Sequence, residues 1–424
     1  MRVEFDALEY GGDGRFAPVR CVFEGDTEAG WTVLRNGAAH LTLGAGYRLL
    51  RVISCGVCST DLARRFLPFP LPQITGHEVL AEDEEGRRCV VEINASHLAR
   101  GEVGECPFCR GGLATHCPER LVLGIHDLPG GFGPWILAPR NAVLPLPDEI
   151  PDDAGVLVEP LAAALNAVDR IQARAGETIA VLGPRRLGML VVAALAARRN
   201  AGGCDFRILA LARHPHLLDL ASRFGATDLR LVEGGGTALP DGLADVVIDT
   251  TGNPEAFELA IRLARREVHL KSTHGQPAGG VEHLTEFVVD ELRLAPFAEL
   301  EAEEAPELPR PLCCVVGDTE QFSRAIRPVN GREEAAIMPR GQILLRHDAD
   351  VGNSPLLRAV RDRGLQLSSS RCGDFRSALD LLGRDAGLRE IGARLITHRF
   401  PAANMAHAFE VAAAPDCVKA VIEH

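Results

Sequence analysis

Residues 178–188 read Thr-Ile-Ala-Val-Leu-Gly-Pro-Arg-Arg-Leu-Gly. The short apolar run Thr178–Leu182 is typical of a strand that is buried on both faces of a parallel sheet. Gly183 and Gly188 enclose a turn, and the following residues Met189–Arg198 favour a helix. A strand, a glycine turn and a helix in this order can hold a pyrophosphate at the helix N-terminus. The segment therefore predicts a doubly wound α/β domain that binds a nucleotide.

The same alternation of strands and helices continues on both sides of this segment. A helix is expected over Ala154–Ile171, where Asp152 can cap its start. Helical stretches separate the further buried strands that we expect, which are Arg207–Ala212, Leu229–Val232, Asp245–Asp249 and Glu267–Lys271. This pattern is typical of a parallel sheet that is covered by helices on both faces.

The first part of the chain has a different sequence pattern. From Met1 to about Pro147, short β-like runs alternate with turns that are rich in glycine and proline. The runs are Val19–Phe23, Tyr47–Ile53, Arg88–Ile93 and Ala142–Leu146. They predict a small, irregular β-rich domain.

Residues 276–364 are less regular, and an acidic, proline-rich piece over 299–311 indicates an exposed linker. The run Val246–Thr250, with the helix-like stretch after it, is echoed by Val315–Thr319. Each is followed by a strand-like run, at Glu267–Ser272 and Gln342–Arg346. A duplicated strand–helix–strand element and a chance likeness between short α/β units both explain this echo.

Composition limits the kinds of partner. The chain has 424 residues, with 46% hydrophobic and 24% charged residues, which is ordinary for a folded protein of two or three domains. A net charge of -13 disfavours nucleic acid and anionic membranes as partners. The sequence contains no apolar run long enough for a membrane span and no signal-like start, so a cytoplasmic location is expected.

Two groups of residues suggest metal binding. Five of the 12 cysteines crowd into one segment, which in a reducing compartment favours metal over disulfides. Cys58, His77 and Glu159 offer the thiolate, imidazole and carboxylate ligands of a catalytic zinc. With Zn²⁺ their charges sum to zero, which lets a bound alcohol lose its proton. Taken singly, they are more often a buried thiol, a core histidine and a helix-start acid, but the combination favours zinc.

Several motifs together resemble the zinc-dependent medium-chain alcohol dehydrogenases, especially their threonine- and sorbitol-dehydrogenase-like branch. The motifs are Gly56–Asp61, Gly76–Glu78, Cys106–Cys117, Glu159–Leu165, Val181–Gly188 and Lys271–Thr273. The resemblance implies a GroES-like catalytic domain over residues 1–160 and a Rossmann domain over 161–371. It also implies a return to the catalytic domain over 372–424, and we place an insertion at about 297–364.

The resemblance also assigns roles to the residues around Cys58, His77 and Glu159. Cys58 and His77 are implied as zinc ligands, while Glu78 and Glu159 share or exchange the remaining inner position. Asp61 is expected to orient a ligand, and Thr60 to take the proton of the substrate. Cys55 is then a buried or spare thiol. Many relatives have a proton-relaying histidine where this chain has Ala63, so its relay is expected to be shorter.

Cys106, Cys109 and Cys117 match three of the four cysteines that close a structural zinc site in this family. Val103 stands at the position of the missing first cysteine. His97, Glu102 or Glu105 could replace it, and otherwise the loop holds no metal. Three unpaired thiols without a metal are the alternative, which we consider less favourable because such thiols are reactive.

The expected nucleotide contacts are Gly183, Arg185, Leu187, Gly188, Arg213, Thr251 and Lys271. Arg185 replaces the middle glycine of the usual motif, and we expect it to supply charge to the pyrophosphate. After the second strand, Leu211–His214 contains Arg213 and no acid, which favours the 2′-phosphate of NADP over the ribose of NAD. Arg213 as a solvated helix-start residue is the alternative.

These observations predict an oxidoreductase that moves hydride between an alcohol, polyol or carbonyl compound and a nicotinamide, with zinc and NADP as cofactors. The resemblance further implies a homo-oligomer, a dimer or tetramer. Two alternatives stay open. One is a metal-independent quinone or enone reductase that uses NADPH, and the other is a non-catalytic nucleotide-binding scaffold.

Overall fold

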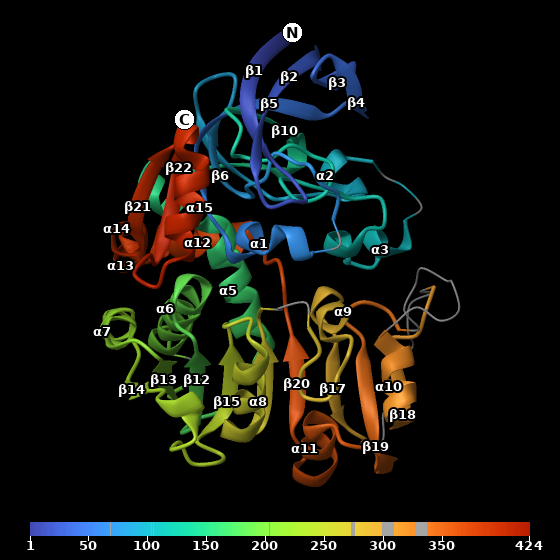
Figure 1. The fold of residues 1–424 in the computed structure, drawn as a ribbon, viewed down its shortest axis with the longest axis vertical. Coiled ribbons are helices and arrows are strands. Elements are labelled where there is room, and N and C mark those ends of the chain that lie inside the picture. The colour runs from blue at the N-terminus through green and yellow to red at the C-terminus, as the bar shows by residue number, and fades with distance from the viewer. Residues whose placement is uncertain are drawn as a thin grey trace. The chain divides into compact units, whose positions relative to one another are not determined.

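The fold is described from a computed structural model, which defines residues 1–67, 69–102, 104, 106–202, 204–272, 276–298, 309–326 and 337–424. These residues divide into two compact units. Unit 1 comprises Met1–Ala162 and Asp374–His424, and unit 2 comprises Ala163–Gly373. Helices and strands are labelled in Figure 1.

Unit 1 is rich in antiparallel strands. A four-stranded meander contains β1 (Arg2–Tyr10), β2 (Phe16–Asp26), β3 (Gly30–Arg35) and β4 (Ala38–Leu43). A second sheet has the order β11-β7-β6-β5-β22-β21, with β10 also paired to β5. Its strands are β5 (Tyr47–Gly56), β6 (Glu78–Glu82), β7 (Arg88–Val91), β10 (Trp135–Pro139), β11 (Val143–Pro145), β21 (Ile396–Pro401) and β22 (Lys419–Glu423). The end of the chain therefore supplies two strands to the sheet that begins at residue 47.

Short elements connect these strands. The unit also contains a small sheet of β8 (Asn94–Ala95) and β9 (Leu121–Val122) and the short helices α1 (Ser59–Leu62), α2 (His97–Arg100) and α3 (Pro107–Arg110). The other helices of this unit are α12 (Phe375–Arg384), α13 (Ala386–Arg389), α14 (Ile391–Leu395) and α15 (Met405–Ala413). The predicted helix Ala154–Ile171 is observed as two helices, α4 (Asp152–Gly155) and α5 (Val158–Arg170), with a turn at residues 156–157 between them.

Unit 2 contains one nine-stranded sheet with the order β14-β13-β12-β15-β16-β20-β17-β19-β18. The first six strands are parallel and have the order of a doubly wound dinucleotide-binding sheet. They are β12 (Thr178–Leu182), β13 (Arg207–Ala212), β14 (Asp228–Leu231), β15 (Ala244–Asp249), β16 (Ala264–Leu270) and β20 (Gln366–Ser369). The predicted fold class, a β-rich unit with a doubly wound parallel sheet, is confirmed.

Helices join these strands as expected for such a sheet. They are α6 (Arg186–Asn200), α7 (Pro215–Arg223), α8 (Pro254–Leu263), α9 (Leu284–Val289), α10 (Thr319–Ile326) and α11 (Pro355–Arg363). The core between the sheet and its helices is built from large apolar side chains such as Phe257, Phe287 and Phe322, each fully buried or nearly so. Strand β12 is buried at every position, as expected for an apolar run inside such a sheet.

The less regular part of the sequence lengthens this sheet. Strand β17 (Arg293–Pro296) pairs antiparallel with β20, and β19 (Gln342–Asp350) and β18 (Cys313–Asp318) follow it in parallel. Figure 1 shows these strands at one side of the sheet, with α10 and α11 beside them. Most of the acidic linker predicted over 299–311 lies outside the described residues.

The suspected repeat corresponds to two similar elements. The first, β15–α8–β16, and the second, β18–α10–β19, are both strand–helix–strand units whose two strands pair in parallel. The two stretches are alike because each forms the same kind of strand–helix–strand unit. This likeness agrees equally well with a duplication and with a chance resemblance. Within the described residues, no helix has the length and apolar character required to cross a membrane.

Candidate metal and nucleotide sites

One buried carboxylate organises the loop that carries Cys58. Strand β5 ends at Gly56, and Cys58 is the N-cap residue of the short helix α1. The Asp61 carboxylate accepts hydrogen bonds from the backbone N–H of Cys58 at 2.8 Å and of Gly76 at 3.3 Å. Asp61 is 1% exposed, so this contact is shielded from water. A single side chain therefore fixes the two loops that present Cys58 and His77.

The imidazole of His77 lies beside Asp61. Its Nδ1 is 3.5 Å from Asp61 Oδ1, and both side chains are buried. Burial opposes protonation of the ring, but Asp61 and Cys58 together raise the pKa of His77 well above its usual value. Donor atoms of Cys58, His77 and Glu78 all lie within 4.8 Å of one another. This concentration of negative charge beside an imidazole suits a divalent cation.

The third donor of this group is held by a lysine from the other end of the chain. Glu78 forms a buried ion pair with Lys419 of β22, and both side chains are at most 4% exposed. Lys419 also donates to the carbonyl oxygen of Val57 at 3.1 Å. A Cβ at Gly56 would lie 2.0 Å from Glu78 Oε2, so the absence of a side chain there leaves room for the pair. Sequence reasoning missed Lys419, although a lysine inside an apolar strand run was a signal.

The remaining residues predicted for this site are distributed around it. Thr60 is half-buried on α1. Glu159 is half-buried in the first turn of α5, and it does not belong to the group of donors within 4.8 Å of one another. Cys55 is fully buried, and its thiol is likewise outside that group. The structure thus brings together Cys58, His77 and Glu78, whereas the roles of Glu159 and Thr60 stay predictions.

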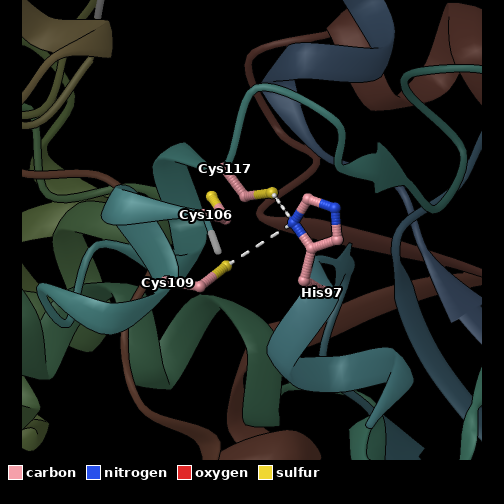
Figure 2. Close-up of side chains that lie close together, drawn as sticks. All are labelled: His97, Cys106, Cys109 and Cys117. Carbon is pink, nitrogen blue, oxygen red and sulfur yellow. Dashed lines mark hydrogen bonds between the residues drawn. The ribbon is translucent and has the colours of Figure 1, made fainter. Parts of the chain in front are cut away.

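A second donor group contains the three cysteines of the later loop. Figure 2 shows Cys106, Cys109 and Cys117 close together beside the ring of His97, which comes from α2. His97 Nδ1 is 3.1 Å from Cys117 Sγ and 4.0 Å from Cys109 Sγ, and the four donor atoms all lie within 4.8 Å of one another. Three thiolates and one imidazole are an established ligand set for structural zinc.

The structure also distinguishes the candidates for the fourth position. The other ring nitrogen of His97, Nε2, lies 3.2 Å from the Glu119 carboxylate, the arrangement in which a carboxylate orients a metal-binding histidine. Glu102 instead receives two hydrogen bonds from Arg100 at 2.8 and 2.9 Å. Glu105 and Val103 lie outside the described residues. Of the described candidates, His97 is the one that meets the cysteines.

The nucleotide turn is pinned to the end of the neighbouring strand β15. Thr250 Oγ1 donates to the carbonyl oxygens of Leu182 and Gly183 at 3.0 and 2.9 Å. A Cβ on Gly188 would lie 2.5 Å from Thr250 Oγ1, and a Cβ on Gly183 would lie 2.6 Å from Thr251 Cγ2. Gly183 also has a φ of +80°, which L side chains disfavour. Both glycines are therefore required by close packing where the strand order of the sheet reverses.

The other predicted nucleotide contacts occupy different surroundings. Arg185 is half-buried and is the residue before α6, and Leu187 is half-buried in its first turn. Arg213 is exposed between β13 and α7, and Thr251 is exposed after β15. Lys271, in contrast, is 6% exposed at the end of β16. Thr273, also part of the quoted motif, lies outside the described residues.

Comparison with known proteins agrees with this architecture. Residues 44–148 match the family model of the alcohol dehydrogenase GroES-like domain. An L-threonine 3-dehydrogenase of Rhizobium etli is 27% identical over 228 residues, which cover 51% of this chain and 61% of that relative. An L-galactonate-5-dehydrogenase of Escherichia coli is 29% identical over 246 residues, which cover 52% and 67%. The chain thus spans about three fifths of the length of the first of these curated relatives.

Solved structures resemble the whole chain in fold. A zinc-binding dehydrogenase from Sinorhizobium meliloti, solved with NADP bound, superimposes with a TM-score of 0.61 at 20% identity and covers 100% of both chains. A 2R,3R-butanediol dehydrogenase from Bacillus subtilis gives 0.58 at 18% identity, with the same coverage. The matches to the GroES-like family model and to the curated dehydrogenases make this chain similar to the medium-chain alcohol dehydrogenases, the family that its motifs resemble. The solved structures show the same fold.

Proposed function

We propose that this protein is a zinc-dependent alcohol dehydrogenase that moves hydride between a small alcohol or polyol, or its carbonyl product, and NADP. The observation that carries the proposal is the gathering of the Cys58, His77 and Glu78 donors within 4.8 Å of one another beside the buried Asp61. Zinc at these residues would supply a Lewis acid for the alcohol or carbonyl oxygen. The curated relatives named above act on hydroxyl-bearing substrates, which supports this substrate class.

The chain's own residues have distinct tasks in this proposal. Asp61 holds the backbone of Cys58 and of Gly76, which precedes His77, so the loops that carry both ligands are ordered before metal arrives. Lys419 neutralises Glu78 and limits how strongly that carboxylate competes for the cation. Thr60 is the group that takes the proton of the substrate, and Glu159 would share or exchange with Glu78 the remaining inner position at the zinc.

The nucleotide is assigned to unit 2. Gly183 and Gly188 form the turn at the start of α6, where the N-terminal N–H groups favour a pyrophosphate. Arg185 and Leu187 flank that turn, and Thr251 lies at the end of the neighbouring strand. The exposed Arg213 after β13 is the feature that favours the 2′-phosphate of NADP. We also infer a second, structural zinc at His97, Cys106, Cys109 and Cys117.

The remaining parts of the proposal follow the family resemblance. We infer a cytoplasmic homo-oligomer with domains over residues 1–160, 161–371 and 372–424. The division of the described residues into 1–162 with 374–424 and 163–373 supports these boundaries.

Metal analysis combined with a substrate panel tests the function. The wild-type chain should carry about two zinc ions and bind NADPH with a micromolar Kd, at about -8 kcal/mol. Cys58→Ser should lose one zinc and the oxidation of sugars, polyols or simple alcohols. Cys55→Ala, from the same Cys-x-x-Cys stretch, should keep both zinc ions. Full activity in Cys58→Ser, or no NADPH binding at millimolar concentration, would contradict the proposal.

A further inference from the structure

A row of polar side chains crosses the buried interior of unit 2 between β16 and β20. Glu267, His269 and Lys271 alternate along β16 and its end, so they share one face of the sheet. Ser368 and Ser370 do the same on β20 and its end, and the two strands pair in parallel with His269 opposite Ser368. All five residues are at most 6% exposed. Burying such polar side chains costs free energy unless they form hydrogen bonds with one another.

The five side chains form one unbroken series of hydrogen bonds. Lys271 Nζ donates to Ser370 Oγ at 3.1 Å, and Ser370 Oγ lies 2.8 Å from His269 Nε2. On the other side of the ring, His269 Nδ1 lies 2.8 Å from Ser368 Oγ, which donates to Glu267 Oε1 at 2.5 Å. We call this series the β16–β20 chain.

The direction of every bond in the β16–β20 chain follows from its two ends. The hydroxyl hydrogen of Ser368 is used on the Glu267 carboxylate, so His269 Nδ1 must carry a hydrogen and donate to Ser368. At the other end the ammonium of Lys271 can only donate. Ser370 therefore accepts from Lys271 and donates to His269 Nε2. The imidazole is a neutral ring protonated at Nδ1, between a cation and an anion.

The electrostatics of the surroundings agree with a neutral ring. Burial, reinforced by the positive charges of Lys271 and Arg170 and opposed by Glu291, lowers the pKa of His269 to about 3. A buried imidazolium beside the Lys271 ammonium would be unfavourable. His269 can therefore pass a proton on from Nε2 to Nδ1 without resting as a cation.

The two ends of the chain lie in different surroundings. Lys271 follows β16 at the carboxyl ends of the parallel strands, where sheets of this type bind their ligands. Its Nζ also donates to the carbonyl oxygen of Arg371, whose own N–H is held by Glu291 at 2.9 Å. At the other end, Glu267 Oε2 accepts from Arg266 at 3.1 Å, and Arg266, 18% exposed, pairs with Glu177.

We propose that the β16–β20 chain is a proton wire that carries protons from Lys271, at the ligand-binding end of the sheet, to Glu267 at the near-surface end. This rests on the proposed function, because oxidation of an alcohol by NADP releases one proton for each hydride transferred. The wire starts at Lys271 Nζ and ends at the Glu267 carboxylate, whose second oxygen accepts from the partly exposed Arg266.

One proton passes along the wire in four transfers. Lys271 Nζ gives a proton to Ser370 Oγ, Ser370 gives its hydroxyl hydrogen to His269 Nε2, His269 gives the Nδ1 hydrogen to Ser368, and Ser368 protonates Glu267. Lys271 is left as a neutral amine, Glu267 as a neutral acid and His269 as the Nε2–H form. The wire is reset once Glu267 has lost its proton, Lys271 has gained one, and His269 has exchanged its Nε2 hydrogen for one at Nδ1.

The first test needs no substrate. The chain has only two lysines, Lys271 and Lys419, so ¹⁵N-lysine labelling gives two Nζ signals, and Lys271→Met assigns them. In NADP-loaded protein, exchange of the Lys271 Nζ hydrogens with water should slow at least about tenfold in Ser370→Ala, which opens the wire, and in His269→Gln, which bonds but cannot relay. ¹⁵N-histidine spectra should show His269 as the neutral Nδ1–H form.

Ser369→Ala is the matched control. Ser369 is buried on the same strand, but its hydroxyl donates to the carbonyl oxygens of Phe287 and Leu292, outside the wire. Exchange should be unchanged in this variant. Equal effects of Ser369→Ala and Ser370→Ala, no effect of Ser370→Ala, or an Nε2–H ring in the wild type would each overturn the proposal.

The second test uses turnover. With an alcohol substrate, proton release followed by a pH indicator should lag behind NADPH formation in Ser370→Ala and keep pace with it in Ser369→Ala. Simultaneous release in Ser370→Ala would contradict the wire. If the protein oxidised no alcohol, the proposed function would fail, whereas the exchange measurement would still decide whether the wire conducts.

Discussion

At the scale of single residues, His97 shows how the structure selects one ligand from several candidates that the sequence offered. The family pattern places the missing donor at Val103, yet the ring that meets the cysteines belongs to α2, beyond the intervening loop. Residues His97–Arg100 form this helix, whose N-cap is Ser96. The donor that meets the three cysteines thus stands six positions before Val103 in the sequence.

This geometry predicts the metal content of two variants. His97→Ala should reduce zinc from about two ions per chain to about one, because three thiolates alone leave a tetrahedral site incomplete. Glu102→Ala, which changes the rejected neighbour, should keep both ions. Metal content after gel filtration distinguishes them, and equal loss of zinc in the two variants would refute the assignment of His97.

Lys419, in contrast, is a residue whose importance could not be predicted from local sequence. It lies 341 positions from Glu78, and the pair forms because the last strand of the chain joins the sheet that contains β5 and β6. No spacing rule links residues at that separation. Cys58, His77 and Glu78 were predictable because short motifs carry them, whereas their buried counter-charge depends on the completed sheet.

Removing this counter-charge should be costly. In chelator-treated protein, Lys419→Met should lower the free energy of unfolding by about 3 kcal/mol, because it leaves the Glu78 carboxylate buried and unpaired. Urea unfolding measures the loss. The double variant Glu78→Gln/Lys419→Met should recover much of it, and a double variant no more stable than Lys419→Met would show that the ion pair is not the cause.

At the scale of elements, predictability depended on burial. Strand β12 was predicted with its observed bounds, because a strand that is covered on both faces has a continuous run of apolar residues in its sequence. Strands β1, β3 and β4 were missed, since they belong to a meander with many exposed positions and mixed composition. The antiparallel strand β17 was also missed, because its pairing with β20 joins segments far apart in the sequence.

The hairpin of β6 and β7 offers a prediction about pH. Asp83, in its turn, accepts from the N–H groups of Glu85 and Arg87 and from the side chains of Arg87 and Arg48. Desolvation opposes its ionisation, but these bonds lower the pKa of Asp83 to about 2.

Because this pKa is below the usual value, the stabilisation is complete above the unfolded-state pKa and is lost as pH falls toward 2. Asp83→Asn should therefore reduce the free energy of unfolding clearly at pH 7 and less at pH 3. Urea unfolding at the two pH values measures this difference. Glu84→Gln, at an exposed neighbour, should show no such change, and a pH-independent effect of Asp83→Asn would contradict the explanation.

At the scale of the whole molecule, the two kinds of ligand belong to different units. Both metal-donor groups lie in unit 1, whereas the nucleotide turn and the β16–β20 chain lie in unit 2. The sequence predicted this division, because short β-like runs give way to alternating strands and helices near residue 150. It could not predict that unit 1 is completed by residues 374–424, except through the family resemblance, because strand pairing across the chain leaves no local signal.

This division predicts that metal and nucleotide stabilise different parts of the chain. A chelator should increase hydrogen exchange mainly over residues 1–162 and 374–424, since metal binding there contributes to folding. NADPH at a hundred times its Kd should add about 2.7 kcal/mol to the stability of whatever binds it, with protection concentrated over residues 163–373. Mass spectrometry of exchanged peptides resolves the two patterns. Chelator effects centred on β12 and α6, or NADPH protection centred on the Cys106–Cys117 loop, would show that the ligands have been assigned to the wrong units.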